Sequence, residues 1–251
     1  MQQEESADAT KTQAATTAAP HRIIVIGGHT RSIGKTQLVC DVIRAFPKVN
    51  WIAGKITQYG HGVCAQNGQH CDCAPDEHVS ALAWERDAQS GTDSARFLVA
   101  GAQRSFWLRT KQGFLAEGLP LMRAALDKLA NTNTHSGLSA GRNAESENHP
   151  SALILESNSL LQFLRPSLYF AVVDPSRDDF KDSARSALDR ADALVLRGPM
   201  NPASPEPAWL KLPAALLRLK PSVTQREGEP LPEPLHVLIE RVLQSPPNVV
   251  L

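Results

Sequence analysis

Glycines, a lysine and a threonine stand close together near the start of the chain, in the segment IIVIGGHTRSIGKTQL at residues 23–38. Four β-branched residues lead into a glycine pair, and after a short polar loop Gly34-Lys35-Thr36 opens an apolar helical pattern. In such a strand–loop–helix, backbone N–H groups converge on phosphate oxygens where glycine leaves room, and the helix adds its positive end. Lys35 would reach the β- and γ-phosphates, and the Thr36 hydroxyl would ligate Mg²⁺. The segment therefore predicts a P-loop for a nucleoside triphosphate.

The spacing within this loop departs from the standard P-loop pattern. Five residues separate Gly28 from Gly34, one more than in the usual G-x-x-x-x-G-K-[ST] sequence. The order of strand, loop and triplet still favours a phosphate site over a plain glycine turn. His29 and Arg31 lie within the loop. Each is a candidate contact to phosphate or to a second substrate, and solvent exposure is the alternative.

A second motif, LILES at residues 153–157, is an apolar run that ends in Glu156. In P-loop proteins a strand beside the first one carries an acid at its carboxyl end, which holds Mg²⁺ directly or through water. Glu156 is placed for that role. The alternative is a surface glutamate that closes a strand.

Cysteine and histidine cluster in one window, HGVCAQNGQHCDCAPDEH at residues 61–78. Thiolates and imidazoles at short spacing suit Zn²⁺ or an iron–sulfur cluster. The Cys-x-Cys spacing differs from the usual Cys-x2-Cys knuckle, so a loop with free thiols is the alternative. The candidate ligands are Cys64, Cys71, Cys73, His61, His70 and His78. Cys40, in the predicted P-loop helix, is expected to be a core side chain.

Bulk composition limits the class of protein. The chain has 251 residues, of which 42% are apolar, and its 26 Lys and Arg balance 26 Asp and Glu. This balance gives no electrostatic preference for nucleic acid or a membrane surface, and no apolar run approaches the roughly 18–20 residues of a membrane span. Residues 1–20 open with acids and lack a hydrophobic h-region, so we expect a disordered tail rather than a signal peptide. We therefore expect a cytoplasmic protein whose cysteines are thiols or metal ligands.

Strand-like and helix-like segments alternate along the chain, which predicts an α/β fold with a doubly wound, mainly parallel sheet and helices on both faces. Residues 21–251 would form a single P-loop NTPase domain, with a Cys/His-rich loop at 56–78 and a flexible insertion at 131–150. The predicted strands are 21–27, 49–55, 152–155, 168–173 and 193–196, and the predicted helices are 34–46, 79–90, 94–109, 119–129, 179–190 and 235–244. Ser176 or Asp178 is the candidate N-cap of the helix at 179–190.

Aromatic residues and one strand-end acid are weaker candidates. Trp51, Trp84, Phe106 and Trp107 are expected to pack rather than to stack on a ligand. Asp174 follows the apolar run at 168–173. It would either line a nucleotide crevice or cap a helix.

Four segments together resemble a known group of P-loop proteins. GGHTRSIGKT resembles the P-loop of dethiobiotin synthetase, and WIAGKITQYG resembles the second strand of that group, which carries a functional lysine. GTDSARFLVAGA at 91–102 and LILESNSLLQFLRPSLYFAVVD resemble segments of molybdopterin-guanine dinucleotide biosynthesis protein B. The nickel-insertion GTPases of urease and hydrogenase belong to the same broader class. The matches span about 21–130 and 150–200 and keep their order along the chain.

The resemblance implies roles for individual residues. Lys35, Lys55 and Glu156 would be catalytic, with Lys55 facing the γ-phosphate or an acceptor and Glu156 near Mg²⁺. Asp93 and Arg96 would lie in a switch-like segment that contacts the nucleotide. The phosphates would be lined by Gly28, Thr30, Ser32, Ile33, Gly34, Lys35 and Thr36.

Two positions depart from the pattern of the group. Ser157 stands where the family has a glycine after its glutamate, and the strand at 193–197 ends in Leu196-Arg197-Gly198 where relatives often present an asparagine to the base. Asn201 is nearby but displaced. The choice between GTP and ATP therefore stays open.

Three functions are compatible with these motifs. The first is a GTP- or ATP-binding protein with Mg²⁺ and slow hydrolysis, accessory to molybdenum-cofactor or metal-centre assembly, whose partner would be a cofactor-synthesis or metalloenzyme client protein. The second is a metallochaperone that carries Zn²⁺ or Ni²⁺ on its Cys/His loop. The third is an ATP-dependent ligase like dethiobiotin synthetase. A homodimer is an open alternative to a monomer.

We predict that the protein, purified without chelator from a reducing cytosol, carries about one Zn²⁺ or one iron–sulfur cluster per chain, or per dimer if two loops share it. Three thiols within ten residues are seldom left together without a ligand role, and the fourth ligand would be His61, His70, His78, Asp72 or a group from a second subunit. Replacing Cys71 and Cys73 together with serine should remove the metal and leave nucleotide affinity within a few-fold. Elemental analysis measures this, and a metal-free parent protein that still binds nucleotide would contradict it.

Overall fold

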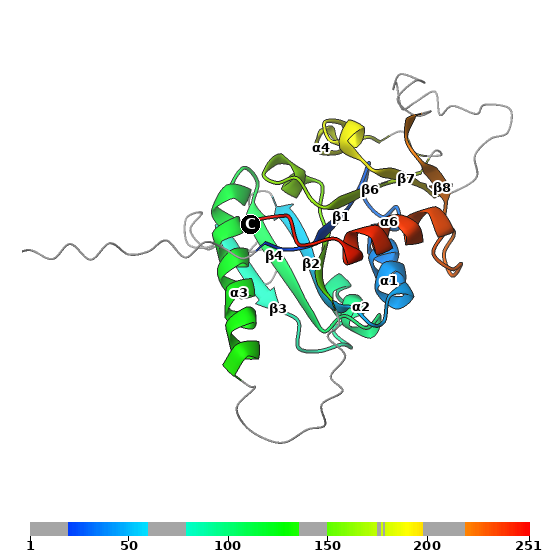
Figure 1. The fold of residues 1–251 in the computed structure, drawn as a ribbon. Coiled ribbons are helices and arrows are strands. Elements are labelled where there is room, and N and C mark those ends of the chain that lie inside the picture. Colours follow the sequence, from blue (N-terminus) through cyan, green and yellow to red (C-terminus); the bar gives the residue numbers. More distant parts are fainter. Residues whose placement is uncertain (1–19, 60–78, 136–149, 175–176, 178, 198–218) are drawn as a thin grey trace, which may run out of the picture.

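A computed structural model of the chain describes residues 20–59, 79–135, 150–174, 177, 179–197 and 219–251, with backbone alone at 130–135. The described residues form one sheet of eight strands in the order β3-β4-β2-β5-β1-β6-β7-β8 (Figure 1). Every neighbouring pair is parallel except β3 with β4. The strands are β1 Ile23–Gly28, β2 Asn50–Tyr59, β3 Ser80–Trp84, β4 Arg104–Lys111, β5 Ser151–Glu156, β6 Leu168–Val173, β7 Ala193–Leu196 and β8 Ser222–Thr224. The predicted α/β fold with a mainly parallel sheet is confirmed.

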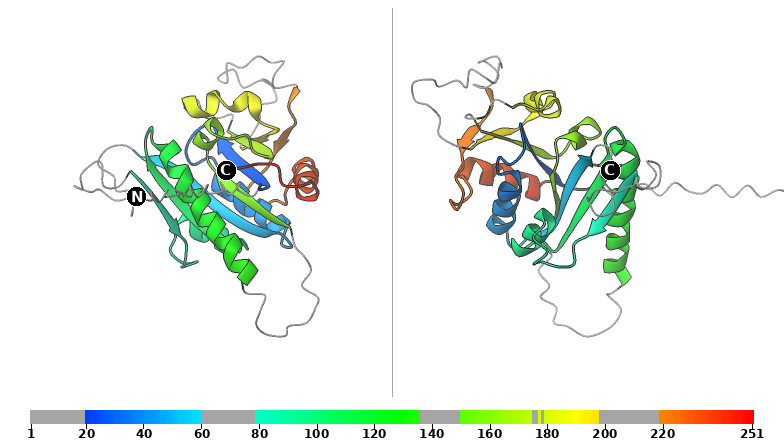
Figure 2. Two further views of the ribbon diagram at one scale, coloured as in Figure 1. Left: turned by 60° about the vertical axis from the view of Figure 1, so that its left-hand side comes forward. Right: turned by 180° about the vertical axis from the view of Figure 1, so that it is seen from behind.

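Helices cover both faces of this sheet. Figure 2 shows α3 on the side opposite to α1 and α6. The α-helices are α1 Lys35–Ala45, α2 Asp93–Val99, α3 Leu115–His135, α4 Asp182–Arg185 and α6 Glu233–Gln244, and the short 3₁₀ helices are η2 Ser159–Gln162 and η3 Leu188–Arg190. None of the helices in the described part of the chain is long and apolar enough to cross a membrane.

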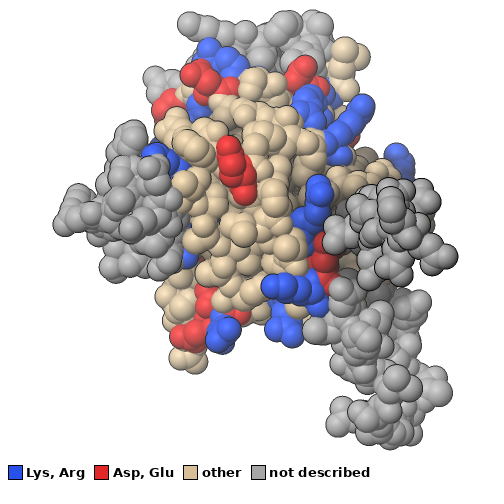
Figure 3. Space-filling view, turned by 90° about the vertical axis from the view of Figure 1, so that its left-hand side faces the viewer, with Lys and Arg blue, Asp and Glu red and all other residues tan. Residues whose placement is uncertain are grey.

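Alternating side chains divide the apolar core into two layers. Ile24 and Ile26 of β1 pack with α1, α2 and α6 on one face, whereas Ile23 and Val25 pack with α3 on the other. All six residues of β6 are buried, as is typical of a parallel strand covered on both faces. On the outer surface seen in Figure 3, acidic and basic side chains are interspersed around a largely uncharged centre, in keeping with the balanced charge of the chain.

The prediction of helices at 79–90 and 94–109 is wrong. The segment 79–90 contains the antiparallel strand β3. Leu82 and Trp84, two residues apart on this strand, both pack against the core. The segment 94–109 divides into α2 and β4, with the turn at Gly101, whose φ of 111° ends the helix in the left-handed region favoured by glycine. Phe106 and Leu108, both fully buried, follow the period of two that is typical of a strand.

Elsewhere the predicted elements occur with shifted ends. The runs at 152–155, 168–173 and 193–196 are parallel strands, and a final helix occurs at Glu233–Gln244. The helix predicted at 119–129 extends over Leu115–His135, so the first residues of the predicted insertion at 131–150 are helical.

The helix predicted at 179–190 reduces to α4 with its N-cap at Lys181, followed by η3. The candidate caps Ser176 and Asp178 lie outside the described residues, as do the first 19 residues of the predicted tail and residues 136–149 of the insertion.

Candidate functional site

The loop between β1 and α1 has the tight curvature expected of a phosphate cradle. Gly34 has φ 86° and Ser32 has φ 53°, both in the left-handed region. A Cβ on Gly28 would lie 2.7 Å from Ile33 Cδ1 and 3.0 Å from Lys35 Cγ. Gly28 and Gly34 are thus required for different reasons, close approach at the first and backbone conformation at the second. Ile33 is only 4% exposed and anchors the loop to the core.

Lys35 points into the curve of this loop. Its Nζ donates to the carbonyl oxygen of Thr30 at 2.8 Å. Burial lowers the pKa of Lys35; the nearby carboxylate of Glu156 opposes this shift, and Lys55 adds to it. The ammonium group is therefore held against backbone carbonyls, where the phosphate groups of a nucleotide would compete for it.

Thr36 and Glu156 meet beside the loop. Parallel pairing sets Glu156 level with Ile26, at the end of the strand adjacent to β1. The Thr36 hydroxyl donates to Glu156 Oε2 at 2.6 Å, and Glu156 is 5% exposed. A hydroxyl and a carboxylate in contact form an oxygen donor set that suits a hard cation such as Mg²⁺. The predicted acid thus lies in the predicted place next to the phosphate loop.

Lys55 connects this acid to α2. It lies on β2 level with Glu156, and its Nζ is 3.6 Å from Glu156 Oε1. The same ammonium forms an ion pair with Asp93, the first residue of α2. Arg96 lies 3.7 Å from Asp93 and donates to Gln37 of α1 at 2.8 Å. The structure therefore brings the four predicted charged residues outside the loop, Lys55, Asp93, Arg96 and Glu156, close to one another.

A cleft of about 290 Å³ opens beside this cluster. It is lined by Lys55, Gly91, Thr92, Asp93, Ser94 and Trp107. Trp107 donates from its indole Nε1 to Thr57 at 2.8 Å, so the ring is fixed as one wall. The cleft is bounded by β2, β4 and the start of α2.

Asn158 holds the first glycine of the loop, a role that sequence reasoning missed. Its Oδ1 accepts from the amide of Gly28 and its Nδ2 donates to the carbonyl of Gly28, both at 2.7 Å. Ser157 is buried, and its hydroxyl accepts from the amide of Leu160 to start η2. The signal in the sequence was an amide residue two positions after the strand-end acid, in LILESN.

Residues that follow β6 contact the loop on the side opposite to Asn158. His29 is 1% exposed, accepts the amide of Asp174 on its Nδ1 at 3.4 Å and lies against the ring of Phe180. Thr30 donates to the Asp179 carboxylate, and the Lys181 amide donates to the His29 carbonyl at 2.9 Å. Burial lowers the pKa of His29. His29 is therefore an internal contact of the loop, whereas Arg31 is exposed.

Arg197, at the end of β7, reaches the start of α1 and was not among the predicted site residues. It donates to the carbonyl of Gly34 at 3.3 Å and to the carbonyl of Gln225 at 2.9 Å, and it lies 3.9 Å from Asp41. Arg197 thus joins the ends of β7 and β8 to the P-loop helix. Asn201, the candidate base contact, lies outside the described residues.

The expected packing roles hold for the aromatic residues other than Trp107 and for Cys40. Trp51 and Phe106 are fully buried, and Trp84 meets Phe106 edge-on at 5.4 Å. Cys40 is 1% exposed, and burial raises the pKa of its thiol to about 11.

The predicted Cys/His metal ligands lie outside the described residues. All six candidates fall between Tyr59, the last residue of β2, and Val79, which precedes β3. Within the part of the chain that the structure describes, no group of three metal-ligating side chains occurs. The metal prediction therefore stays a prediction.

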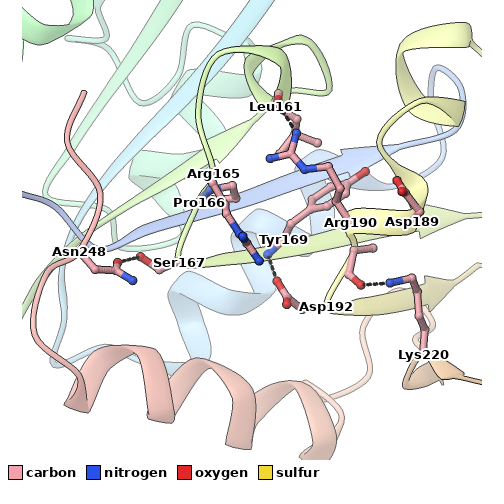
Figure 4. Close-up of a pocket in the computed structure, with 11 residues that line it drawn as sticks. Leu161, Arg165, Pro166, Ser167, Tyr169, Asp189, Arg190, Asp192, Lys220 and Asn248 are labelled. Atoms are coloured by element: carbon pink, nitrogen blue, oxygen red, sulfur yellow. Dashed lines mark hydrogen bonds between the residues drawn. The ribbon is translucent and has the colours of Figure 1, made fainter.

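A larger cavity, of about 890 Å³, lies at the amino-terminal ends of β6, β7 and β8, away from the loop (Figure 4). Two of the three basic side chains in its lining bind the protein's own backbone, because Arg190 donates to the carbonyls of Leu161 and Leu164 and Lys220 donates to that of Ala191. Ser167 is likewise bound to Asn248, at 2.6 Å. These polar groups are explained by the fold, so the candidate site is the phosphate loop.

The glycine loop between β1 and α1, with an acid on the adjacent parallel strand, defines the architecture. This is an α/β fold with a strand–loop–helix of the P-loop type. No known protein family matches the sequence, and no curated protein matches it. Among solved structures, the crystal structure of HypB from Helicobacter pylori in complex with nickel is similar over 89% of this chain and 84% of that one, with 11% sequence identity and a TM-score of 0.38. A likeness of this size carries no argument about function.

We predict that Asn158→Ala lowers the free energy of unfolding by about 1–3 kcal/mol, because it leaves both polar groups of Gly28 without their partner. Urea unfolding followed by circular dichroism measures this change. Gln162→Ala, at an exposed position of η2, is the control and should leave stability within about 0.5 kcal/mol. Equal stabilities of the two variants would show that the amide of Asn158 does not hold the loop.

Proposed function

We propose that this protein binds GTP or ATP with Mg²⁺ and hydrolyses it slowly, as an accessory to the assembly of the molybdenum cofactor or of a metal centre. The observation that carries the nucleotide part is the contact of Thr36 with Glu156 beside a loop whose lysine points inward. Thr36 of α1 and Glu156 of β5 thus offer oxygen ligands for a cation, and Lys35, next to Thr36 in the first turn of α1, offers a cation for phosphate. The phosphate contacts do not read the base, so they serve GTP and ATP alike.

The phosphate chain would lie along the loop residues Gly28, Thr30, Ser32, Ile33, Gly34, Lys35 and Thr36. Lys35 would exchange the carbonyl of Thr30 for the β- and γ-phosphate oxygens. Thr36 and Glu156 would hold Mg²⁺, which supplies charge neutralisation at the β- and γ-oxygens when it is bound.

Lys55 would add a second cation next to the γ-phosphate. Asp93 pairs with it from α2, and Arg96 ties α2 to α1. In such a site catalysis consists of positioning and charge stabilisation rather than covalent chemistry. The fixed pairing of these groups supports slow hydrolysis.

The accessory role is supported by the motif order along the chain, which resembles molybdopterin-guanine dinucleotide biosynthesis protein B. The partners of the present protein would be a nucleoside triphosphate and a client protein of cofactor or metalloenzyme assembly.

The Cys/His cluster at 61–78 supports the second candidate, a Zn²⁺ or Ni²⁺ metallochaperone, in which metal stoichiometry would change with nucleotide state. The cleft beside Lys55 supports the third candidate, a ligase like dethiobiotin synthetase. Its turnover would be rapid and would depend on a small molecule.

Lys35→Ala should abolish binding of Mg²⁺-nucleotide and leave the fold intact, because the variant removes the cation that the loop directs at the β- and γ-phosphates. Calorimetric titration of GTP and of ATP into both proteins tests this. Lys48→Ala, an exposed lysine beyond the other end of α1, is the matched control and should bind as the parent does. Unchanged affinity in Lys35→Ala would overturn the assignment of a P-loop nucleotide site.

Glu156→Gln should reduce turnover and Mg²⁺ dependence more than it reduces binding of the metal-free nucleotide. Glutamine keeps the shape of the side chain and removes the negative charge beside the cation site. Hydrolysis rates measured across a Mg²⁺ titration separate the two effects, with Glu117→Gln on the exposed surface of α3 as the control. If rate and Mg²⁺ dependence both match those of the parent, Glu156 has no role at the metal.

A further inference from the structure

One carboxylate away from the phosphate loop gathers an unusual number of hydrogen bonds. Glu85 directly follows β3, and its Oε1 accepts the amides of the next two residues at 3.0 and 3.1 Å. Its Oε2 accepts three hydroxyl groups of the same segment. The donors to Oε2 are Ser90 at 3.1 Å, Thr92 at 2.7 Å and Ser94 at 2.9 Å.

These hydrogen bonds hold Glu85 in its charged form. Partial burial raises the pKa of Glu85, but the hydrogen bonds from Thr92, the Asp87 amide, Ser94 and Ser90 outweigh burial and lower the pKa to about 2. The folded-state pKa is thus below that of an ordinary glutamate, so the interaction is present at neutral pH and is lost as the pH falls toward 2. Glu85 is therefore an anion at neutral pH, and groups from residues 86–94 donate hydrogen bonds to it.

The ordered segment fixes the first turn of α2. Thr92 is the N-cap of that helix, since its Oγ1 accepts the amide of Ala95 at 3.1 Å. The same hydroxyl donates to Glu85, which leaves it one rotamer. Asp93 lies between Thr92 and Ser94, both of which bind Glu85. Its own carboxylate forms the ion pair with Lys55.

From Asp93, which is joined to Thr92 and Ser94 through the backbone, a series of polar contacts runs to the start of α1. Asp93 pairs with Lys55, and Lys55 lies 3.6 Å from Glu156. Glu156 accepts the hydroxyl of Thr36 at 2.6 Å. Figure 1 shows the chain passing from β3 into α2 beside β2, the strand that carries Lys55.

We propose that Glu85 is a positioning residue of the nucleotide site, which acts by fixing the start of α2 so that Asp93 holds Lys55 next to Glu156. This inference rests on the proposed function. Glu85 itself touches neither the phosphate loop nor the cation ligands. Its effect must pass through Asp93, and this distinguishes it from a residue that only stabilises a surface turn.

The experiment compares the parent, Glu85→Gln, Asp93→Asn and the double variant, with Asp87→Asn as a control on the same segment. Asp87 is exposed, and its side chain accepts only the amide of Gln89 among the described contacts. Affinity for Mg²⁺-GTP and Mg²⁺-ATP is measured by calorimetry, turnover by phosphate release, and stability by thermal unfolding.

Glu85→Gln should lower turnover about ten- to a hundredfold with nucleotide affinity changed less than about threefold, because a displacement of order 1 Å at a positioning group has effects of this size. In the Asp93→Asn background the same substitution should have no further effect on turnover, since the intermediary is already lost. Asp87→Asn should behave as the parent does.

Three results would overturn the assignment. They are parent-like turnover in Glu85→Gln, turnover losses of Glu85→Gln and Asp93→Asn that multiply in the double variant, and a loss of turnover matched by a loss of thermal stability. A parent protein that binds no nucleotide would instead overturn the proposed function. The link from Glu85 to α2 would then be judged by hydrogen exchange of the amides at 93–97, which should lose protection in Glu85→Gln and keep it in Asp87→Asn.

Discussion

The parallel pairing of β1 with β5 is the constraint on which the site depends. In this register Ile26 is level with Glu156, so the strand-end acid lies beside the helix that begins at Lys35. A shift of one residue would move every side chain of β5 to the other face of the sheet. Glu156 would then face the α3 layer, away from Thr36. Alternate apolar side chains of β1 and β5 pack into the two core layers, and this packing prevents the shift.

The same register places the supports of the loop. Glu156 is level with Ile26, so Asn158, two residues after Glu156, reaches Gly28, two residues after Ile26. From the other side the segment after β6 holds His29 and Thr30, and Arg197 after β7 holds the carbonyl of Gly34. Both halves of the loop are therefore fixed by residues that follow neighbouring strands, and a preformed loop lowers the ordering cost of binding phosphate.

Charge around the loop is nearly balanced among the groups described. Lys35 and Lys55 face Glu156 and Asp93, and Lys55 contacts both carboxylates. The proposed ligand, a triphosphate with a divalent cation, would bring both kinds of charge, so each of these groups would gain a new partner without leaving an unpaired charge in a partly buried site.

The sheet continues beyond Lys55 and Glu156, since β2 extends to Tyr59 and β4 to Lys111. These strands form a wall next to the cleft that contains Trp107.

Local sequence determined the elements that depend on short-range patterns. The β-branched run, the glycines and the Gly34-Lys35-Thr36 triplet placed the loop, and three short apolar runs placed β5, β6 and β7, because burial on both faces needs continuous apolar residues. The placement of Lys35, Thr36 and Glu156 near one another followed from residue type and position at strand and helix ends. Tertiary structure alone decided that 80–84 and 104–111 are strands, since their period of two had meaning only once β3 and β4 paired. Tertiary structure also decided the contacts of Asn158, Arg197 and Glu85. The partners of these side chains cannot be read from the sequence pattern. For Asn158 and Arg197 the reason is that parallel pairing brings distant segments to one edge of the sheet.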